Sequence, residues 1–428
     1  MGENKTVKRK GLKAAAIILG VVAFIIAFLF GFFLRGAIVG KDAAALSEIA
    51  AYLKEYGVFD STTAELREFS PEDAARIMVG SIPDEYATYY SKEEYDELKN
   101  RHNGKYDGIG VSVYDDTLKI AKVTVNSPAF KAGLHPEDVL ISGTKGNNTV
   151  VFSDVKSVGN FLAEVSDGDF YITVSRDGEE KSFPLKYEKY ISSYLLYKDK
   201  DSTYAYLGDY DDGTKLVRAG DGINSLPDNV AYIRFDLFEG DAAKELKGML
   251  SLMKEKGKTK LILDMRGNGG GQMDVLSDFA AGVIKGDSGL AIAYSKDNKG
   301  KFTEYNASKN YYYDSIEKIA VIADENSASA TECLIGAMLF YGGAFSENSL
   351  IIENENLTDG AAKTFGKGIM QTTFMLSNGG AVKLTTAVIY RPDKTTCIHG
   401  KGITVSGDNA VIRSDNKAID RAIEVLAD

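Results

Sequence analysis

The sequence predicts an α/β fold with a mixed β-sheet, a separate small β-rich domain, and an apolar segment near the N-terminus. Three observations lead to this prediction. From Val230 onward, strand-like apolar runs alternate with amphipathic runs of helical length, as in βαβ units with parallel pairing. Between residues 104 and 190 the strand-like runs are shorter and closer together. Near the N-terminus, residues 14–34 contain no charged side chain.

The length, charge and cysteine content of the chain restrict the classes of function that it can have. With 428 residues and 44% hydrophobic content, it can form two or three domains with substantial cores. A net charge of -11 argues against nucleic acid as a partner, because phosphate binding needs clustered lysine and arginine. The two cysteines, Cys333 and Cys397, match no metal-ligand spacing, and a single disulfide between them remains open. We expect neither a metal nor a cofactor.

Residues 14–34 are predicted to form a transmembrane helix, since at 1.5 Å per residue they would cross a hydrocarbon core of ~30 Å. Residues 1–13 carry five positive charges and one negative charge, so this tail should stay in the cytoplasm. The rest of the chain would then be extracytoplasmic and anchored to the cell membrane by a single span. A cleaved signal peptide is the alternative, but its apolar region is usually ~7–15 residues, and "GKDAAA" is a poor cleavage site.

Two regions precede the predicted core. Residues 43–102 are expected to be mainly helical, with Ser70 as the N-cap and Pro71 as the first residue of one helix. Residues 104–190 form a small, partly open β-domain in which the helix-like segments "SPAFKAGL" and "SDVKSVGNFLAEV" interrupt the strands. A polar stretch rich in glycine and aspartate, residues 198–229, would separate this domain from the alternating strands and helices that begin at Val230.

The predicted α/β core spans residues 191–428. The strands "VAYIRF", "KLILDM" and "KIAVIAD" alternate with helices, and two further β-runs, "IMQTTFML" and "AVKLTTAVIY", come after the helix that begins at Ser329. We expect the first group to pair in parallel and the closing pair to make the sheet mixed.

Ser329 lies at the junction between the turn "ENSAS" and an apolar helix. Ser329 to Glu332 spells the S-x-x-E of a capping box, and most serines at such positions only cap the helix. A nucleophilic role is chemically feasible, because the first amides of a helix have no internal partner and that of Ala330 could donate to an oxyanion. A nucleophilic serine also needs a base, and none of the three histidines has an evident aspartate–serine setting.

The segment "LDMRGNGGGQ", residues 263–272, leads from a strand into a helix. Its glycines expose backbone amides, but their spacing matches neither phosphate-binding motif. The segment is therefore either a tight turn or the source of a second oxyanion donor, from Gly270 or Gly271.

A third segment, "TFGKGIMQ", places Lys367 between two glycines at the start of a β-run. Such a lysine is ordinarily a solvated strand end. However, Lys367 and Gln371 are four residues apart, so on a strand their side chains would share one face. Apolar neighbours such as Phe365 would desolvate the ammonium group and make it easier to deprotonate. A Ser–Lys pair needs no histidine.

Together these segments resemble the carboxy-terminal processing peptidases, the tail-specific Ser–Lys proteases that carry a PDZ domain. The resemblance covers nearly everything after residue 70. It rests on segments in the family order: "IPDEYATYYSKEEYDEL", "YDGIGV", "SPAFKAGLHPEDVL", "LDMRGNGGG", "NSASATE", "TFGKGIMQ" and "LTTAVIYRPDKTTCIHGKGI". It implies a ClpP/crotonase-like core at 191–428 and a PDZ domain at 104–190.

The resemblance also implies roles for individual residues. Ser329 would be the nucleophile, Lys367 the general base and Gln371 the residue that positions the lysine. The amides of Ala330 and of Gly270 or Gly271 would form the oxyanion hole. The PDZ loop that receives the terminal carboxylate of a polypeptide substrate would consist of Gly108, Ile109, Gly110 and Val111. The implied protein is a membrane-anchored serine endopeptidase that cuts extracytoplasmic proteins near their C-termini.

The sequence departs from the family pattern in a few places. Leu339 and Phe340 replace a polar Gln–Asp pair, which excludes a role for an aspartate there. The 38-residue separation of Ser329 and Lys367 (367 − 329) includes residues 345–363, which we interpret as an inserted hairpin or flap near the site. The Gly–Asp pair of the PDZ motif is replaced by Glu137–Asp138, and the Pro–Asp pair that commonly comes after the Gly–Ile motif is absent at "GITVSGD". Both differences are compatible with the resemblance.

Two other functions are compatible with parts of the pattern. A catalytically inactive, PDZ-bearing scaffold is disfavoured because both Ser329 and Lys367 are present. An acyl-CoA enzyme of the crotonase type would share the oxyanion geometry, but an extracellular location without CoA argues against it. The oligomeric state stays open, and a homo-oligomer is compatible with the sequence.

Overall fold

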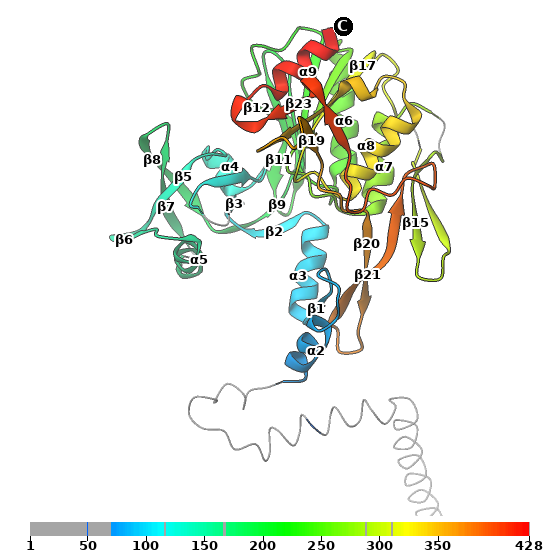
Figure 1. The fold of residues 1–428 in the computed structure, drawn as a ribbon. Helices are drawn as coiled ribbons and strands as arrows, with labels where there is room; N and C mark the ends of the chain where they lie inside the picture. The colour runs from blue at the N-terminus through cyan, green and yellow to red at the C-terminus, as the bar shows by residue number, and fades with distance from the viewer. Residues whose placement is uncertain are drawn as a thin grey trace, which may run out of the picture. The chain divides into compact units, whose positions relative to one another are not determined.

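The computed structural model describes residue 49 and residues 70–427, except 115–116, 166–167, 287–288 and 310. The predicted tail and transmembrane segment lie outside the described residues. Within the described part, no helix is long and apolar enough to cross a bilayer. The chain divides into two compact units, Met1–Ser91 and Lys92–Asp428, whose elements are labelled in Figure 1.

The described part of the first unit contains α2 (Pro71–Gly80) and β1 (Thr88–Tyr90). α2 begins as predicted. Ser70 is its N-cap, and the Ser70 Oγ accepts a hydrogen bond from the Asp73 N–H at 3.2 Å. The Asp73 carboxylate in turn accepts from the Ser70 N–H at 2.7 Å, which completes a capping box. The second unit opens with α3 (Lys92–His102).

A small β-domain comes after α3 and has its own apolar core, which includes Phe161, Phe170 and Ile172. Four strands form an antiparallel sheet in the order β6–β5–β7–β8, and β2–β9 and β3–β4 form separate pairs. The predicted helix-like segments are α4 and α5. The elements are β2 (Lys105–Gly108), β3 (Val111–Val113), β4 (Ile120–Val123), α4 (Pro128–Ala132), β5 (Val139–Lys145), β6 (Asn148–Val151), α5 (Val155–Glu164), β7 (Asp169–Arg176), β8 (Glu179–Lys186) and β9 (Glu188–Ile191).

The remainder of the second unit is the α/β core. Its elements are β10 (Leu195–Lys198), β11 (Thr203–Asp209), β12 (Gly213–Gly220), β13 (Val230–Phe235), α6 (Ala242–Glu255), β14 (Lys260–Asp264), α7 (Met273–Val283), β15 (Ala291–Asp297), β16 (Phe302–Asn306), β17 (Lys318–Asp324), α8 (Ala330–Tyr341), η2 (Glu347–Ser349), β18 (Leu350–Asn354), β19 (Ala361–Lys363), β20 (Ile369–Met375), β21 (Ala381–Tyr390), β22 (Thr404–Ser406), η3 (Gly407–Asn409), β23 (Ala410–Ile412), η4 (Arg413–Asp415) and α9 (Ala418–Ala427).

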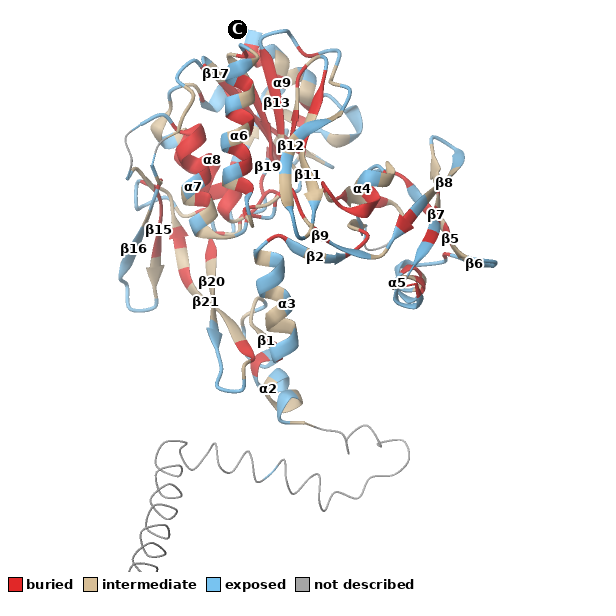
Figure 2. Cartoon of the chain, turned by 180° about the vertical axis from the view of Figure 1, so that it is seen from behind, coloured by how far each residue is buried: buried red, intermediate tan, exposed pale blue. Residues whose placement is uncertain are grey.

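The main sheet has eight strands in the order β12–β11–β10–β13–β14–β17–β18–β23. Both of its faces are covered, and the apolar residues of the central strands alternate between them. On β14, Leu261 and Leu263 join the core that includes α6, α7 and α8, whereas Ile262 joins the core that includes α9. Figure 2 shows the resulting buried centre of the molecule. The core is thus a three-layer α/β/α arrangement.

The sheet is mixed, as predicted, but for a different reason. Pairing is parallel from β13 to β23 and antiparallel from β12 to β13. The closing pair, β20 and β21, was expected to provide the antiparallel part. It instead forms a second antiparallel sheet with β15 and β16.

The stretch 198–229 is not the separator that its composition suggested. Residues 203–220 form the β11–β12 hairpin, which extends the main sheet through β10. The polar residues that dominate the composition occupy the turn and the exposed face. Alternation in "TYAYL" and "TKLVR" is the period-2 signal that identifies such strands.

Residues 345–363 do not form an inserted flap. Leu350, Ile351 and Ile352 are fully or almost fully buried, and β18 pairs in parallel with both β17 and β23 inside the main sheet. A continuous apolar run such as "LII" is typical of a strand buried on both faces. The extra length between Ser329 and Lys367 therefore contains a core strand.

The parallel strands place the functional loops together. The segments after β13, β14, β17 and β18 all leave the carboxyl ends of neighbouring strands (Figure 1). Ligand sites in α/β sheets usually form at this edge. The segments 265–272 and 325–329, which come after the adjacent strands β14 and β17, therefore meet.

Candidate active site

Ser329 lies in the turn between β17 and α8, with φ 56° and ψ -117°. A non-glycine residue in this region costs about 1–3 kcal/mol and persists only where its surroundings enforce it. The restraint comes from Glu332, whose carboxylate accepts a hydrogen bond from the Ser329 N–H at 2.9 Å. The Ser329 side chain is half-buried, so it stays accessible at the first turn of α8.

Ser327, the other serine of this turn, has a structural role because its hydroxyl connects two turns. It is fully buried. Its Oγ accepts from the Asp324 N–H at 2.9 Å and donates to the Met265 carbonyl at 2.8 Å. Ser327 therefore ties the turn after β17 to the turn after β14, and Ser329 is the serine left facing outward.

The glycine turn 267–271 lies directly against Ser329. A Cβ at Gly270 would be 2.8 Å from the Cβ of Ser329 and 2.9 Å from the Ala330 nitrogen, closer than real Cβ contacts allow. Gly270 also has a φ of +105°, which side chains rarely adopt. Only glycine lets the two turns approach this closely.

Two backbone amides remain available beside Ser329. Among the residues that the structure describes, the N–H groups of Gly271 and Ala330 donate to no acceptor. The N–H of Gly270 donates instead to the Asn268 side chain at 3.0 Å. Of the two glycines proposed from the sequence, Gly270 thus supplies space and Gly271 supplies the unused donor.

Asn268 is a residue that the sequence reasoning missed. It is fully buried, and its amide donates to the Phe235 carbonyl at 3.1 Å. Its side-chain oxygen also accepts from the Thr331 hydroxyl at 2.9 Å. Because Thr331 belongs to the first turn of α8, Asn268 fixes the glycine turn against the start of that helix. An asparagine within a glycine-rich turn was the available signal.

The turn after β14 is further anchored by a buried ion pair. The Arg266 guanidinium contacts both the Asp264 carboxylate, at 2.6 Å, and the Glu353 carboxylate, at 2.9 Å. Burial disfavours the charged form of Asp264. The charge and hydrogen bonds of Arg266 outweigh this effect, so the pKa of Asp264 is lowered. Both carboxylates lie at strand ends, of β14 and β18, so the pair holds the edge from which the glycine turn leaves. The sequence reasoning had assigned these residues no role.

Glu332 also holds the lysine segment. Its carboxylate accepts from the N–H groups of Gly366 and Lys367, at 2.8 and 2.9 Å, and from the Thr364 hydroxyl at 2.5 Å. Glu332 is fully buried. The same carboxylate therefore binds the backbone of Ser329 and the backbone of Lys367, which brings the two candidate residues to one place. From the sequence Glu332 could be recognised only as a helix-cap residue, so its contact with the lysine segment was not predicted.

The relation predicted between Lys367 and Gln371 differs in the structure. Lys367 precedes β20, which begins at Ile369, and a register shift lies between Met370 and Gln371. The two side chains therefore do not share a strand face by simple alternation. The Gln371 amide donates to the Thr385 hydroxyl at 3.2 Å, across the β20–β21 hairpin.

The surroundings of Lys367 also differ from the expectation. Its side chain is half-buried, but Phe365 is 55% exposed, so that ring does not enclose the lysine. Residues 398–402 pack on the other side of the segment. The Gly400 N–H donates to the Gly366 carbonyl at 2.9 Å, and a Cβ at Gly368 would be 2.4 Å from the His399 nitrogen. The "CIHG" segment thus lies beside the lysine segment, with the His399 side chain exposed.

The predicted carboxylate loop lies in the small β-domain. Gly108 belongs to β2 and Val111 to β3, and the Ile109 side chain is buried in the core of this domain. Within the described ranges, the N–H groups of Ile109 and Gly110 have no acceptor. A Cβ at Gly110 would be 2.1 Å from the Cβ of Ser127, so glycine is required there.

The cysteines and the other histidines lie elsewhere. Cys333 and Cys397 are free thiols, and burial raises the pKa of Cys333 to about 12, which leaves it unreactive at neutral pH. His102 ends α3, where burial lowers its pKa and its Nε2 lies 3.9 Å from Glu239. His135 belongs to the small β-domain. None of these side chains contacts Ser329.

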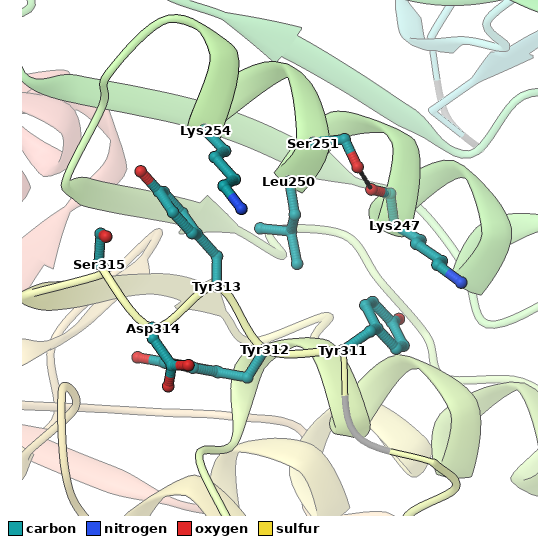
Figure 3. Close-up of a pocket in the computed structure, with 9 residues that line it drawn as sticks. All are labelled: Lys247, Leu250, Ser251, Lys254, Tyr311, Tyr312, Tyr313, Asp314 and Ser315. Carbon is teal, nitrogen blue, oxygen red and sulfur yellow. Dashed lines mark hydrogen bonds between the residues drawn. The ribbon is translucent and has the colours of Figure 1, made fainter.

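Figure 3 shows a pocket of about 300 Å³ between α6 and residues 311–315. Tyr311 and Tyr313 lie toward α6, which contributes Leu250 and two exposed lysines, Lys247 and Lys254, whereas Tyr312 points toward Asp314. The pocket contains none of the candidate catalytic residues, so the chemistry is not placed in this hollow.

Comparison with known proteins adds independent information. Residues 229–346 and 356–406 match the family described as "Peptidase family S41". The chain is 27% identical over 414 residues to a "Probable CtpA-like serine protease" of Staphylococcus aureus (strain COL), covering 94% of this chain and 73% of that protein. The protein of the same name in Staphylococcus haemolyticus (strain JCSC1435) is 28% identical over 335 residues, covering 78% and 58%.

Among solved structures, the chain is similar to the photosystem II D1 C-terminal processing protease. The sequence identity is 20% and the TM-score 0.44, and the match covers 90% of this chain and 92% of that one.

Proposed function

Since the chain is a serine peptidase of family S41, of the carboxy-terminal processing type, we propose that it is a membrane-anchored endopeptidase that cuts extracytoplasmic polypeptides near their C-termini. Ser329 is the nucleophile and Lys367 the general base in this proposal. The small β-domain acts as a PDZ domain that receives the substrate tail.

One observation carries the catalytic part of the proposal. The buried carboxylate of Glu332 accepts hydrogen bonds from the backbone N–H groups of both Ser329 and Lys367, each at 2.9 Å. Ser329 is also strained and half-exposed, as a nucleophile at a strand-to-helix turn should be. A serine and a lysine held together without a histidine support Ser–Lys chemistry.

The proposed reaction follows from this arrangement. The neutral amine of Lys367 takes the proton from the Ser329 hydroxyl as its oxygen attacks the carbonyl carbon of the scissile peptide bond. The oxyanion that forms accepts hydrogen bonds from the unused amides of Gly271 and Ala330. Lys367 then gives its proton to the leaving amine, and the peptide C–N bond breaks. Water, deprotonated by the same lysine, hydrolyses the acyl-enzyme and regenerates Ser329.

The small β-domain suggests how the substrate tail is bound. The free amides of Ile109 and Gly110 could donate to a terminal carboxylate, and hydrogen bonds to a charged group contribute about 1.5–3 kcal/mol each. The membrane anchor rests on the uncharged segment 14–34 and the positive charges that precede it.

The direct test is cleavage of an unfolded model protein, with Ser329→Ala as the inactive control and mass spectrometry to locate the cuts. We expect the cleavage sites to lie near the C-terminus of the substrate, and we expect no cleavage by Ser329→Ala. Cleavage by Ser329→Ala at the wild-type rate would contradict the proposed nucleophile. Cuts spread evenly along the substrate would contradict the tail preference alone.

A further inference from the structure

A polar pocket of about 350 Å³ lies at the C-terminal end of α8, and nothing in the proposed mechanism uses it. We call it the Arg391 pocket. It is enclosed by the end of α8, by η2 and the start of β18, by Arg391 after β21, and by residues 402–406. Its volume is at the lower end of the range for small-molecule sites, which is about 300–1,000 Å³.

Arg391 is unusual because its charge is not neutralised. In the described portion of the chain it forms no ion pair. Its Nε is buried and has no hydrogen-bond partner. That nitrogen is covered by α8 at Gly336, so a ligand in the pocket would meet the terminal Nη groups of Arg391, which have neither an ion-pair nor a hydrogen-bond partner among the described residues. A guanidinium presents its donors in a planar fork that matches a carboxylate.

The side chain is held in place by a glycine on α8. A Cβ at Gly336 would be 3.1 Å from the Arg391 Nε and 3.2 Å from two of its carbons. Gly336 therefore makes room for the stem of Arg391 on the helix that begins after Ser329. The guanidinium is positioned by packing and has no counter-ion among the residues that the structure describes.

The remaining polar groups limit what the ligand can be. Glu347 also lines the pocket, and the hydroxyls of Thr404 and Ser406 add further donors and acceptors. A simple anion would be attracted by Arg391 but repelled by Glu347. A small molecule that carries both a carboxylate and an ammonium group satisfies both.

We propose that the Arg391 pocket binds a short zwitterionic peptide of about dipeptide size, with its α-carboxylate on Arg391 and its α-ammonium on Glu347. The identification of the ligand as a peptide rests on the proposed function, because an endopeptidase that cuts near C-termini releases short peptides. The binding itself does not depend on activity.

The pocket is linked to the catalytic segments through backbone contacts. The Ile403 N–H at its wall donates to the Thr364 hydroxyl at 2.8 Å, and that hydroxyl donates to Glu332 at 2.5 Å. Glu332 in turn holds the backbone of Ser329 and Lys367. A peptide seated on Arg391 and residues 402–406 would therefore stiffen the segment that carries the general base.

The test is calorimetric titration of the full chain carrying Ser329→Ala, which cannot cleave the ligand. The probes are Ala-Ala, its C-terminal amide, its N-acetyl form and inorganic phosphate. We expect Ala-Ala to bind, and both blocked forms and phosphate to bind at least about 10-fold more weakly, since each loses one charged contact. Adding Arg391→Gln should remove the binding that requires both charged termini, and adding Glu347→Gln should weaken binding of Ala-Ala but not of its N-acetyl form. Binding of a terminal carboxylate by the Ile109–Gly110 loop would not respond to N-acetylation.

The matched control is Lys254→Gln, which removes one positive charge from the separate pocket of Figure 3 and should leave binding unchanged. Circular dichroism would confirm that Arg391→Gln folds. Three outcomes would overturn the inference: no binding of Ala-Ala at millimolar concentration, equal binding of the amide or of phosphate, or undiminished binding by a folded Arg391→Gln variant. An inactive wild-type enzyme that still binds Ala-Ala would contradict only the proposed function.

Discussion

The Oε2 atom of Glu332 accepts a hydrogen bond from the backbone N–H of Lys367 at 2.9 Å, across 35 residues of sequence. The same atom accepts from the Ser329 N–H. One buried carboxylate therefore ties the backbones of the two candidate catalytic residues together.

Replacing Glu332 should impair catalysis. Glu332→Ala leaves the donors of Ser329, Thr364, Gly366 and Lys367 without their acceptor, at ~1–3 kcal/mol for each donor that stays buried and unsatisfied. We expect a lower melting temperature and little activity. Glu332→Gln keeps the shape and one acceptor, so it should lower kcat more than it changes KM. Glu255→Gln, at the exposed end of α6, is the control and should change neither quantity.

Replacing the proposed base should be nearly as damaging as replacing the nucleophile. Lys367→Arg keeps the positive charge but cannot lose its proton at workable pH, so kcat should fall by about 10²–10⁴-fold. The rate of cleavage of an unfolded protein measures this. The comparison variant is His399→Ala, whose exposed side chain we assign no proton transfer. If His399→Ala lost activity in a folded protein while Lys367→Arg kept it, the Ser–Lys mechanism would be wrong.

The glycine turn offers a set of closely matched variants. Gly270→Ala would place a Cβ 2.8 Å from Ser329, and Gly271→Ala would place one 2.3 Å from the Phe238 carbonyl oxygen. Both should lose most activity because they shift the proposed oxyanion donor or the nucleophile. Gly269→Ala, one residue earlier, meets no atom within 4 Å and should stay active. Equal activity of all three variants would argue against an oxyanion role for this turn.

The stability of the protein should fall as the pH rises toward neutrality. Burial raises the pKa of Glu245 from 4.5 to about 8, despite hydrogen bonds from Tyr194, Ser193 and Leu195 that favour its charged form. Between these pH values the folded state binds a proton that the unfolded state has released, so the free energy of unfolding decreases with increasing pH.

Glu245→Gln removes this titration. The decline in melting temperature between about pH 5 and pH 8, the range between the unfolded and folded pKa values of Glu245, should therefore become shallower. Burial raises the pKa of Glu239 to about 7 in the same direction, so a residual slope should remain. A variant with a slope as steep as that of the wild type would show that Glu245 is ionised in the folded protein.

The carboxylate loop can be tested without catalysis. A peptide tail with a free C-terminus should bind the Ser329→Ala protein more tightly than the amidated peptide, because the amide removes the charge that the Ile109 and Gly110 amides would face. Fluorescence anisotropy with labelled peptides measures both affinities. Equal affinities would assign the small β-domain some role other than tail recognition.

Much of the architecture was predictable because it depends on local patterns. The strands β13, β14 and β17 and the helices between them follow from periodicity, and the capping box at Ser70 from residue types three apart. The β18 strand was misjudged because its apolar run was compared with a family pattern of expected length before its own periodicity was considered. The β11–β12 hairpin was missed because glycine and aspartate dominated the composition of a segment whose alternation was present.

The site was predictable to a lesser extent. Ser329 and Lys367 could be chosen by motif, but Glu332, Asn268 and Arg266 act through contacts between segments that are distant in sequence. A buried carboxylate that receives four donors from two loops has no local pattern beyond a helix cap. Likewise, the choice between Gly270 and Gly271 depended on which amide Asn268 already occupied, and that is a matter of three-dimensional position alone.

The close approach of residues 398–402 to the lysine segment has a consequence for the activity of the nascent chain during synthesis. The Gly400–Gly366 and Ile403–Thr364 hydrogen bonds join the lysine segment to residues that come more than 30 positions later in the sequence. A nascent chain that has not yet extended past Ile403 would therefore lack the contacts that hold the proposed base beside the proposed nucleophile, and we expect it to be unable to cut itself or its neighbours.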